Sequence, residues 1–510
     1  MMKPKRTDSV GFAQVLRSEW TTFCQARGSL IAMVVAALVT VLLGLAATGL
    51  MHCEGPNGSA CPPVPIGPGG EAVRDKFYFV HQPLAGDGSM TVRVTSLSGL
   101  ITYPPPNHDQ IVPGVVPWAK AGIMIKENMK QGSAYAAMMI TGSHGTRMQY
   151  NFTQDTAGSP GGVSAQSPRW LRLTRSGDIL TGYESTDGTR WTQIGTAHLV
   201  GLPATVQIGL FVTSPGDVTV QEHASRLTQA TATFDHVSLH GNRWTGTSVG
   251  SLQDKSAPSV GNLINGVPAL SIGSFNRSGD TFTVTGSGDV APGTEEGWTT
   301  ERFLIGTVFG LIVVIIVAVF FSTSGRLPGR IYASEQANPK PGRVLVAKAI
   351  VISLVTFTIQ LVAAAITVQL GKHIMLSNGK TVQPVAPLIE LRVVVGTAAL
   401  VGVVAVFALA LGALFQRRVV AVIVGFILAV LSFILANLAP LAVSQWLLRL
   451  TPAAGFAIQQ SIPEYPQVIG LYTPPAGYYP LAPWAGFSVL CGYTALALGL
   501  AVFQLHRRGT

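Results

Sequence analysis

The sequence is poor in charged residues and in cysteine. Only 11% of its 510 residues are Asp, Glu, Lys or Arg, and it has 4 Cys. So few cysteines in so long a chain exclude a small scaffold held together by disulfides. No stretch fits the phosphate-loop pattern G-x-x-x-x-G-K-[ST], so this polypeptide is not itself a nucleotidase of the phosphate-loop class.

Ionisable residues are absent from six long apolar runs. Each run has about 20 residues or more, which is enough to cross the hydrocarbon core of a bilayer as a helix. The runs are 29–51, 303–321, 349–370, 393–416, 419–443 and 484–505, and none contains Asp, Glu, Lys, Arg or His. The sequence therefore predicts a protein of mixed class, with a six-helix transmembrane bundle and a large domain at 52–302, between the first and second spans.

The basic residues next to the spans predict the orientation. With the N-terminus inside, the cytoplasmic segments hold 14 Lys and Arg, whereas the two shorter outer loops hold 4. Because cytoplasmic flanks retain positive charge, both termini are expected in the cytoplasm and the large domain outside. The domain at 52–302 has 16 basic and 19 acidic residues, against 18 and 5 in the remainder. The net charge of +10 thus belongs to flanks that face anionic lipid, and a nucleic-acid partner is not needed.

Two of the four cysteines, Cys53 and Cys61, fall on the predicted outer side, just after the first span. An oxidising exterior favours a disulfide between them. The alternative is a metal site, but these two residues and His52 do not supply four ligands.

The sequence of the predicted outer domain indicates β-structure. Alternating apolar and polar residues recur at spacings of about ten, and the stretch from Trp170 to Gly195 reads as a double hairpin with turns at Ser176-Gly177-Asp178 and Asp187-Gly188. The segments AGIMIKENMKQGSAYAAMMIT, WLRLTRSGDILTGYESTDGTRWTQIG and IGLFVTS resemble concanavalin A-like lectin/glucanase jelly rolls, over about 76–239. The Gly/Ser/Thr-rich segment 240–302 either adds an edge strand or only returns the chain to the membrane.

The jelly-roll resemblance implies a fold but not an activity, because this fold hosts glycan binders, hydrolases and spacers. Glycoside cleavage needs two carboxylates across the scissile bond, and the candidates are Glu127, Glu184 and Asp187. Asp187 is better explained as a turn former and Glu184 as a strand residue, so a binding or structural role is favoured over catalysis.

Three aromatic residues of the outer domain, Trp170, Tyr183 and Trp191, are candidates for stacking on a sugar ring of a cell-surface glycan. A tryptophan at strand spacing is more often part of a core. Both interpretations stay open at this point.

The spans themselves disfavour an ion-coupled transporter, which usually keeps ionisable residues at mid-membrane. Small residues recur within GTAALVGVVAVFALALGALF and GFSVLCGYTALALGLAVF, and such residues let helix backbones approach closely. This pattern indicates a packed bundle without naming a substrate.

The ends of the chain carry a second resemblance. The stretches LRSEWTTFCQARGSLIAMVVAALVTVLLGL, PKPGRVLVAKAIVISLVTF and YYPLAPWAGFSVLCGYTALALGLAVFQLHRRGT are similar to permease subunits of type-2 (exporter-class) ABC transporters, particularly actinobacterial ones. The resemblance implies a bacterial plasma-membrane protein that is not an enzyme and holds no cofactor. Separate ATPase subunits would bind ATP and Mg, and a second permease copy, identical or related, would complete the pore. It also implies short helices near the outer mouth within 444–483.

The same resemblance implies an interfacial helix before the first span. Leu16, Trp20 and Phe23, with Phe12 and Val15, fall at helical spacing on one apolar face. Arg17 and Glu19 are expected to turn away from that face, and membrane lipid is the expected partner.

The loop at 322–348, between the second and third spans, would contact the ATPase. Its candidate coupling residues are Arg330, Pro339, Gly342, Arg343 and Lys348. The first half of the loop differs from the pattern of the family that the chain resembles. Ser324-Gly325-Arg326 and Pro328-Gly329 interrupt the helix expected there.

The alternative function is a membrane-anchored protein that displays a glycan- or surface-binding module, or senses with it, without transport. The altered loop favours this alternative. Display needs one span, however, and this chain has six predicted spans.

Overall fold

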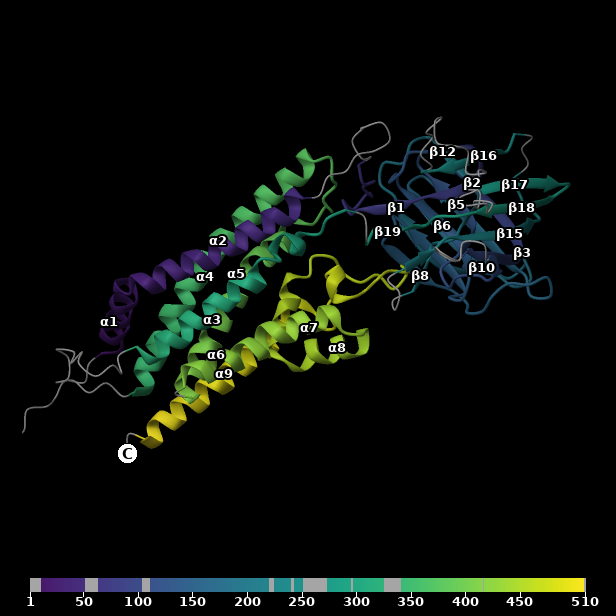
Figure 1. The fold of residues 1–510 in the computed structure, drawn as a ribbon. Helices are drawn as coiled ribbons and strands as arrows, with labels where there is room; N and C mark the ends of the chain where they lie inside the picture. Colours follow the sequence, from purple (N-terminus) through teal and green to yellow (C-terminus); the bar gives the residue numbers. More distant parts are fainter. Residues whose placement is uncertain are drawn as a thin grey trace, which may run out of the picture. The chain divides into compact units, whose positions relative to one another are not determined.

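The computed structural model divides the chain into two compact units, each described here by itself (Figure 1). The helical unit comprises Met1–Pro62, Gly297–Pro463 and Tyr472–Thr510, and the β unit comprises Pro63–Glu296 and Glu464–Leu471. The structure describes residues 11–50, 63–102, 111–219, 224–239, 243–250, 273–294, 297–324, 341–415 and 417–508.

The helices of the helical unit are α1 (Phe12–Gln25), α2 (Arg27–Gly49), α3 (Thr307–Thr323), α4 (Pro341–Ser377), α5 (Pro387–Phe415), α6 (Arg418–Gly425), α7 (Ser432–Leu438), α8 (Leu441–Leu450) and α9 (Pro483–Arg508). A π-helical segment, η3 (Phe426–Leu431), joins α6 to α7, and short 3₁₀ segments are η2 (Thr300–Leu304), η4 (Pro452–Gln459) and η5 (Pro474–Ala476). Five of these segments are long and apolar enough to cross a membrane: α2, α4, α5, α6 to α7, and α9. The predicted apolar helices are confirmed to this extent, and α3 is a shorter apolar helix.

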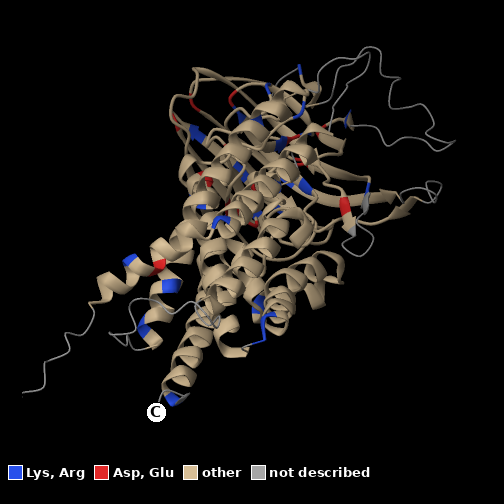
Figure 2. Ribbon diagram, turned by 60° about the vertical axis from the view of Figure 1, so that its left-hand side comes forward, with Lys and Arg blue, Asp and Glu red and all other residues tan. Residues whose placement is uncertain are grey.

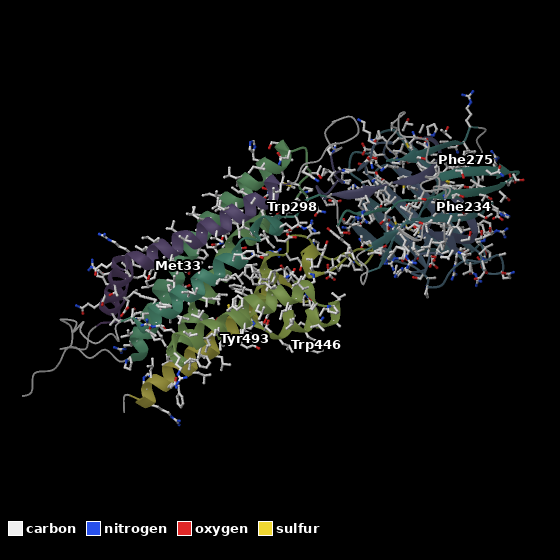
Figure 3. The ribbon with its side chains drawn as sticks, in the orientation of Figure 1. Met33, Phe234, Phe275, Trp298, Trp446 and Tyr493 are labelled. Atoms are coloured by element: carbon white, nitrogen blue, oxygen red, sulfur yellow. The ribbon has the colours of Figure 1, made fainter. Side chains whose placement is uncertain are left out.

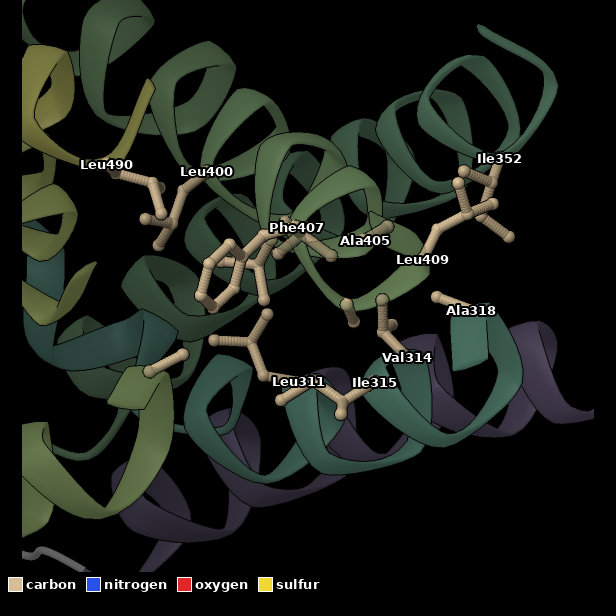
Figure 4. Close-up of a cluster of buried hydrophobic side chains, with 14 of the residues drawn as sticks. Leu311, Val314, Ile315, Ala318, Ile352, Leu400, Ala405, Phe407, Leu409 and Leu490 are labelled. Atoms are coloured by element: carbon tan, nitrogen blue, oxygen red, sulfur yellow. The ribbon is translucent and has the colours of Figure 1, made fainter. Parts of the chain in front are cut away.

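Helix α5 is the central helix of this unit. It packs against α3, α4, α6 and α9, and 72% of its most apolar 18-residue window is buried. Figure 4 shows Phe407 and Leu409 of α5 among Leu311 and Ile315 of α3 and Ile352 of α4. A helix that is apolar on all sides belongs in such a core, which explains the uninterrupted apolar run in its sequence.

Glycines let helices of this unit meet other backbone segments closely. A Cβ on Gly44 of α2 would lie 2.3 Å from the backbone oxygen of Phe303, and one on Gly306 would lie 2.3 Å from that of Thr40. By contrast, nothing lies within 4 Å of a Cβ on Gly492 of α9. Backbone atoms cannot move aside as a flexible side chain does, so these contacts require glycine.

Gly44→Ala is therefore expected to destabilise the chain although alanine favours a helix. The overpacking cost of about 1–3 kcal/mol exceeds the gain of about 1 kcal/mol in helix propensity. Gly492→Ala is the matched control and should leave the thermal midpoint unchanged or raised in detergent. Equal shifts for the two variants would contradict the close contact at Gly44.

The fifth predicted apolar run is shorter as a helix than its composition suggests. Helix α7 ends at Leu438, before the predicted end at Val443, because Pro440 follows and α8 begins separately at Leu441. Pro440 cannot donate a helical hydrogen bond, which explains the break. The following segment contains η4 and η5, each with proline in its first turn.

The strands of the β unit are β1 (Val73–Asp75), β2 (Phe77–Ala85), β3 (Gly88–Thr102), β4 (Ile111–Pro113), β5 (Lys120–Lys126), β6 (Tyr135–Thr141), β7 (Thr146–Tyr150), β8 (Gln154–Ala157), β9 (Arg169–Ser176), β10 (Ile179–Ser185), β11 (Thr192–His198), β12 (Thr205–Thr213), β13 (Asp217–Thr219), β14 (Ala224–Arg226), β15 (Thr228–Asp235), β16 (Thr245–Val249), β17 (Gly273–Ser278), β18 (Thr281–Gly286) and β19 (Val290–Pro292). An eight-stranded sheet has the order β11-β10-β9-β3-β15-β18-β17, with β4 beside β3, and a seven-stranded sheet has the order β16-β2-β12-β5-β6-β7-β8. Two-stranded pairs β1-β19 and β13-β14 complete the unit, and all pairings between these strands are antiparallel.

The two large sheets enclose one apolar core, so the predicted β-sandwich is confirmed. Buried and half-buried residues alternate along β15, and its Phe234 lies within the sandwich (Figure 3). This period of two is the pattern expected of a strand with one buried face. The segment after Leu239 does more than return to the membrane, because it supplies β16, β17, β18 and β19.

The central strands of the seven-stranded sheet are buried on both faces. A second apolar cluster, which includes Phe77, Phe79, Met124 and Phe211, covers the face away from the sandwich core. Every residue of β5 is buried as a result.

Two buried ion pairs attach the ribbon of β1 and β19 to β5. Lys126 Nζ lies 2.7 Å from Asp75 Oδ2, and Lys120 Nζ lies 2.9 Å from Asp289 Oδ1. Both lysines lie on the same face of β5, because their positions differ by an even number. Lys120 Nζ also donates to Val290 O at 2.6 Å. The first and last strands of the unit are thus fixed to one central strand.

Candidate functional site

A helix, α1, is present where the sequence predicts an interfacial helix, and its sequence explains its contacts. Val15 and Phe23 are buried, whereas Phe12 and Trp20 are 38% and 43% exposed. The expectation that Glu19 turns away was wrong. Glu19 lies one helical turn from Val15 and from Phe23, so it is on the buried face of α1. Its Oε2 lies 3.9 Å from Lys348 Nζ of α4.

Lys348 joins three helices at the base of the predicted coupling loop. Its buried ammonium donates to Phe321 O at 3.0 Å, to Ser324 O at 2.6 Å and to Ser324 Oγ at 3.1 Å. These acceptors lie at the C-terminal end of α3, where carbonyls lack helical partners and a cation is favourable. With Glu19, the ammonium thus connects α1, α3 and α4, and we call this arrangement the Lys348 junction.

Aromatic packing surrounds the Lys348 junction. The rings of Phe23 and Phe321 meet edge to face at 5.0 Å, and Lys348 Nζ lies 5.0 Å from the Phe321 ring centroid. The carboxyl of Glu19 is desolvated there, and burial raises its pKa above 4.5, although Lys348 acts in the opposite direction. The Glu19 carboxyl is therefore largely shielded from water, and Lys348 is the cation beside it.

The other predicted coupling residues are distributed differently. Gly342 is buried in the first turn of α4, where a Cβ would lie 3.0 Å from His506 of α9, and Arg343 beside it is exposed. Arg330 and Pro339 lie outside the described residues. The two described ends of the loop, at Ser324 and Pro341, thus lead into α3 and into a helix that contacts α9.

Charge is concentrated away from the helix centres. Figure 2 shows few coloured segments along the helices and blue at the marked C-terminal end of α9. This distribution agrees with the apolar runs of the sequence, and the Lys348 junction is the buried exception near one end of α4.

Sequence reasoning missed a buried acid in front of α3. Glu301 in η2 is 8% exposed, its Oε2 accepts a hydrogen bond from Ser461 Oγ, and Tyr479 is buried with it. A Cβ on Gly477, which has a φ of +92°, would collide with Glu301 Oε1. Burial raises the pKa of Glu301 above 4.5. No sequence motif predicts the burial of Glu301, because a single acidic residue beside an apolar run normally indicates a helix end that is exposed to water.

The pKa of Glu301 gives a pH prediction. Since folding raises this pKa, the folded chain binds a proton that the unfolded chain has released, and the free energy of unfolding falls as pH rises above 4.5. Glu301→Gln should flatten this decline while keeping an acceptor for Ser461. Thermal midpoints measured in detergent across this pH range test it, and parallel profiles for the two proteins would contradict it.

The three candidate glycan-contact residues gather on the outward face of the eight-stranded sheet. Tyr183 pairs with Arg172, and Arg172 Cζ lies 3.8 Å from the centroid of the Trp191 ring. Trp170 lies on the same face of β9 as Arg172. All four side chains are half-buried.

Trp170 is less available than a free stacking platform. A Cβ on Gly188 would lie 2.8 Å from its ring, so the Asp187-Gly188 turn covers it. Arg93 approaches the same ring at 5.7 Å while pairing with Asp235. Packing therefore explains Trp170, whereas Trp191 and Tyr183 keep the candidate role.

The carboxylates considered for glycoside cleavage have structural partners. Asp187 accepts hydrogen bonds from the backbone of Thr189 and Arg190, which lower the pKa of its carboxyl well below its usual range, as a turn former should. Glu184 is buried, and its Oε1 accepts from Ser159 N at 2.9 Å and Oγ at 2.6 Å. Glu127 accepts from Ala134 N at 3.3 Å.

Metal and disulfide chemistry find no support in the described part of the chain. No group of three or more His, Cys, Asp or Glu residues there is placed to hold a metal ion. Cys53 and Cys61, the predicted disulfide, lie outside the described residues, whereas Cys24 and Cys491 are free thiols.

No family model and no curated protein matches the chain. Among solved structures, a functionally unknown protein from Saccharomyces cerevisiae is similar at a TM-score of 0.20 and 14% identity, covering 39% of this chain and 86% of that one. A scytalido-glutamic peptidase bound to a transition-state analogue inhibitor is similar at a TM-score of 0.25 and 9% identity, covering 42% and 98%.

Proposed function

We propose that this chain is the membrane-spanning permease subunit of an ATP-binding cassette transporter of the exporter class. Separate ATPase subunits would bind ATP and Mg, and a second permease copy would complete the pore. The observation that carries the proposal is the Lys348 junction, because it fixes both described ends of the predicted coupling loop to α1 and α3. A force applied to this loop by a partner would reach three helices directly.

The β unit supports a topology with six crossings. The segment Glu464–Leu471, which precedes α9, belongs to the β unit. Within that unit Gln467 Nε2 donates to Thr153 O at 3.1 Å, and Ile469 packs against the sandwich core. A compact sandwich lies on one side of a bilayer, since its sheet edges cannot sit in lipid.

In the proposed topology the chain therefore crosses the membrane an even number of times between residues 296 and 464. The segments available are α3, α4, α5 and α6 to α7, so the short helix α3 is needed as a span. A second observation agrees: Trp298 N donates to Thr381 O at 2.9 Å, which brings the start of α3 to the connection between α4 and α5. With α2 and α9 the proposal has six spans, with both termini in the cytoplasm and the β unit outside the bacterial plasma membrane.

The second candidate function is a membrane-anchored display or sensor protein that binds a cell-surface glycan. Trp191 and Tyr183 on one outward sheet face favour it, with Arg172 between them. The covered ring of Trp170 and the packed bundle around α5 favour the permease.

A photo-activatable crosslinker tests the proposal at Arg343, which is exposed at the base of the loop. The control position is Leu388, 79% exposed in the first turn of α5. In native membranes the Arg343 position should capture a Walker-motif ATPase, identified by mass spectrometry, and Leu388 should not. Capture of no ATPase from Arg343 would favour the display or sensor function.

A further inference from the structure

A groove of about 530 Å³ lies between α1 and α4. Its walls are Leu16 and Trp20 of α1 and Ile350, Val351 and Leu354 of α4, with Ala13, Gln14 and Arg17 completing the lining. This volume is within the range of about 300–1,000 Å³ that small-molecule sites occupy. The groove is thus large enough for a ligand rather than a single water.

The walls of the groove are almost entirely apolar. Ile350 and Leu354 are 41% and 53% exposed, so the described part of the chain does not cover them. Exposed apolar side chains on a membrane-spanning helix normally face acyl chains. An acyl chain therefore matches the chemistry of the groove better than a polar metabolite does.

Arg17 gives the groove one charged position. Its side chain is exposed, and among the described residues no carboxylate forms an ion pair with it. Glu19, on the same helix, is directed to Lys348. Trp20 lies one turn from Arg17, and tryptophan is the residue that favours the headgroup region.

We propose that this groove binds an anionic glycerophospholipid from the leaflet next to α1. The phosphate lies against the Arg17 guanidinium, and an acyl chain lies between Leu16 and Trp20 of α1 and Leu354 of α4. A guanidinium matches phosphate by charge and by planar hydrogen bonding, whereas an apolar peptide would leave Arg17 unpaired. The proposal does not depend on transport.

Quenching of Trp20 by brominated lipids tests the proposal, because Trp20 lines the groove. The full-length chain is reconstituted in phosphatidylcholine vesicles that contain either brominated phosphatidylglycerol or brominated phosphatidylcholine at the same low mole fraction. The Trp20→Phe variant is measured in parallel, so that the difference isolates Trp20 from the other tryptophans. The phosphatidylglycerol probe should occupy the groove about fivefold more strongly, as one basic side chain near an anionic headgroup allows.

Arg17→Gln should remove this preference while leaving the quenching by brominated phosphatidylcholine unchanged. Arg418→Gln is the matched control, because Arg418 lies elsewhere, against the Phe320 ring at 5.0 Å. It should keep the preference. Equal quenching of Trp20 by both probes in the wild-type chain would mean ordinary bulk lipid and would overturn the proposal. Absence of quenching by either probe would mean that protein fills the groove, and would overturn it too.

Discussion

Lys126→Ala is expected to lower the free energy of unfolding of the β unit by about 3–5 kcal/mol. The substitution leaves the carboxylate of Asp75 fully buried without its ion partner, and among the described residues Gly132 N remains as a donor to Asp75 Oδ2, at 2.8 Å. It also removes the donor to Ser133 O at 3.2 Å. Hydrogen exchange of the β5 and β12 amides in the full-length chain measures the effect.

Arg190→Ala is the control for this ion pair. Arg190 pairs with Asp187, but its side chain is 90% exposed and water screens the pair, so the loss should be far smaller than that of Lys126→Ala. The double variant Lys126→Met with Asp75→Leu should recover part of the stability, because no buried charge remains unpaired. Similar losses for Lys126→Ala and Arg190→Ala would contradict the buried role of Lys126.

Lys348→Met is expected to loosen the Lys348 junction, at a cost of about 2–3 kcal/mol, because the hydrogen bonds from the ammonium to Phe321 O and Ser324 O are lost. The freed carboxyl of Glu19 stays partly buried, 15% exposed, without its cation. Faster hydrogen exchange of peptides covering α1 and the end of α3 should report the change. If the chain is a permease, the same variant should reduce the ATP hydrolysis that substrate stimulates in the assembled transporter.

Glu19→Gln is the matched variant and should cost far less. The acceptors on α3 lie within 3.1 Å of the ammonium, whereas Glu19 lies at 3.9 Å, so most of the interaction energy belongs to the carbonyls. A double-mutant cycle separates the two contributions. A Glu19→Gln effect as large as that of Lys348→Met would contradict this order.

Patterns with a strong period predicted the coarse fold. Apolar runs predicted the helices because a span has to bury or face apolar atoms on every side, and alternation in segments such as the one that forms β15 predicted the sandwich. Helix ends were less predictable. The apolar composition continues past Leu438, but Pro440 ends the hydrogen-bonding pattern there.

Residues that act through distant partners were not predictable from local pattern. Lys120 and Lys126 stand at the two ends of an otherwise apolar strand, and their carboxylates, Asp289 beside β19 and Asp75 of β1, are far away in sequence. Glu19 was assigned to a solvated face because its partner Lys348 lies on α4. Lys348 itself was predicted to contact a partner subunit, whereas its ammonium donates to Ser324 O at the end of α3.

Mild-detergent purification of the tagged full-length chain from its native membrane, with mass spectrometry of the co-eluting proteins, tests the central claim most directly. The permease proposal predicts a stoichiometric ATPase with Walker motifs. Absence of such a subunit, under conditions that keep a known ABC complex intact, would contradict the proposal and leave the display or sensor function as the better account.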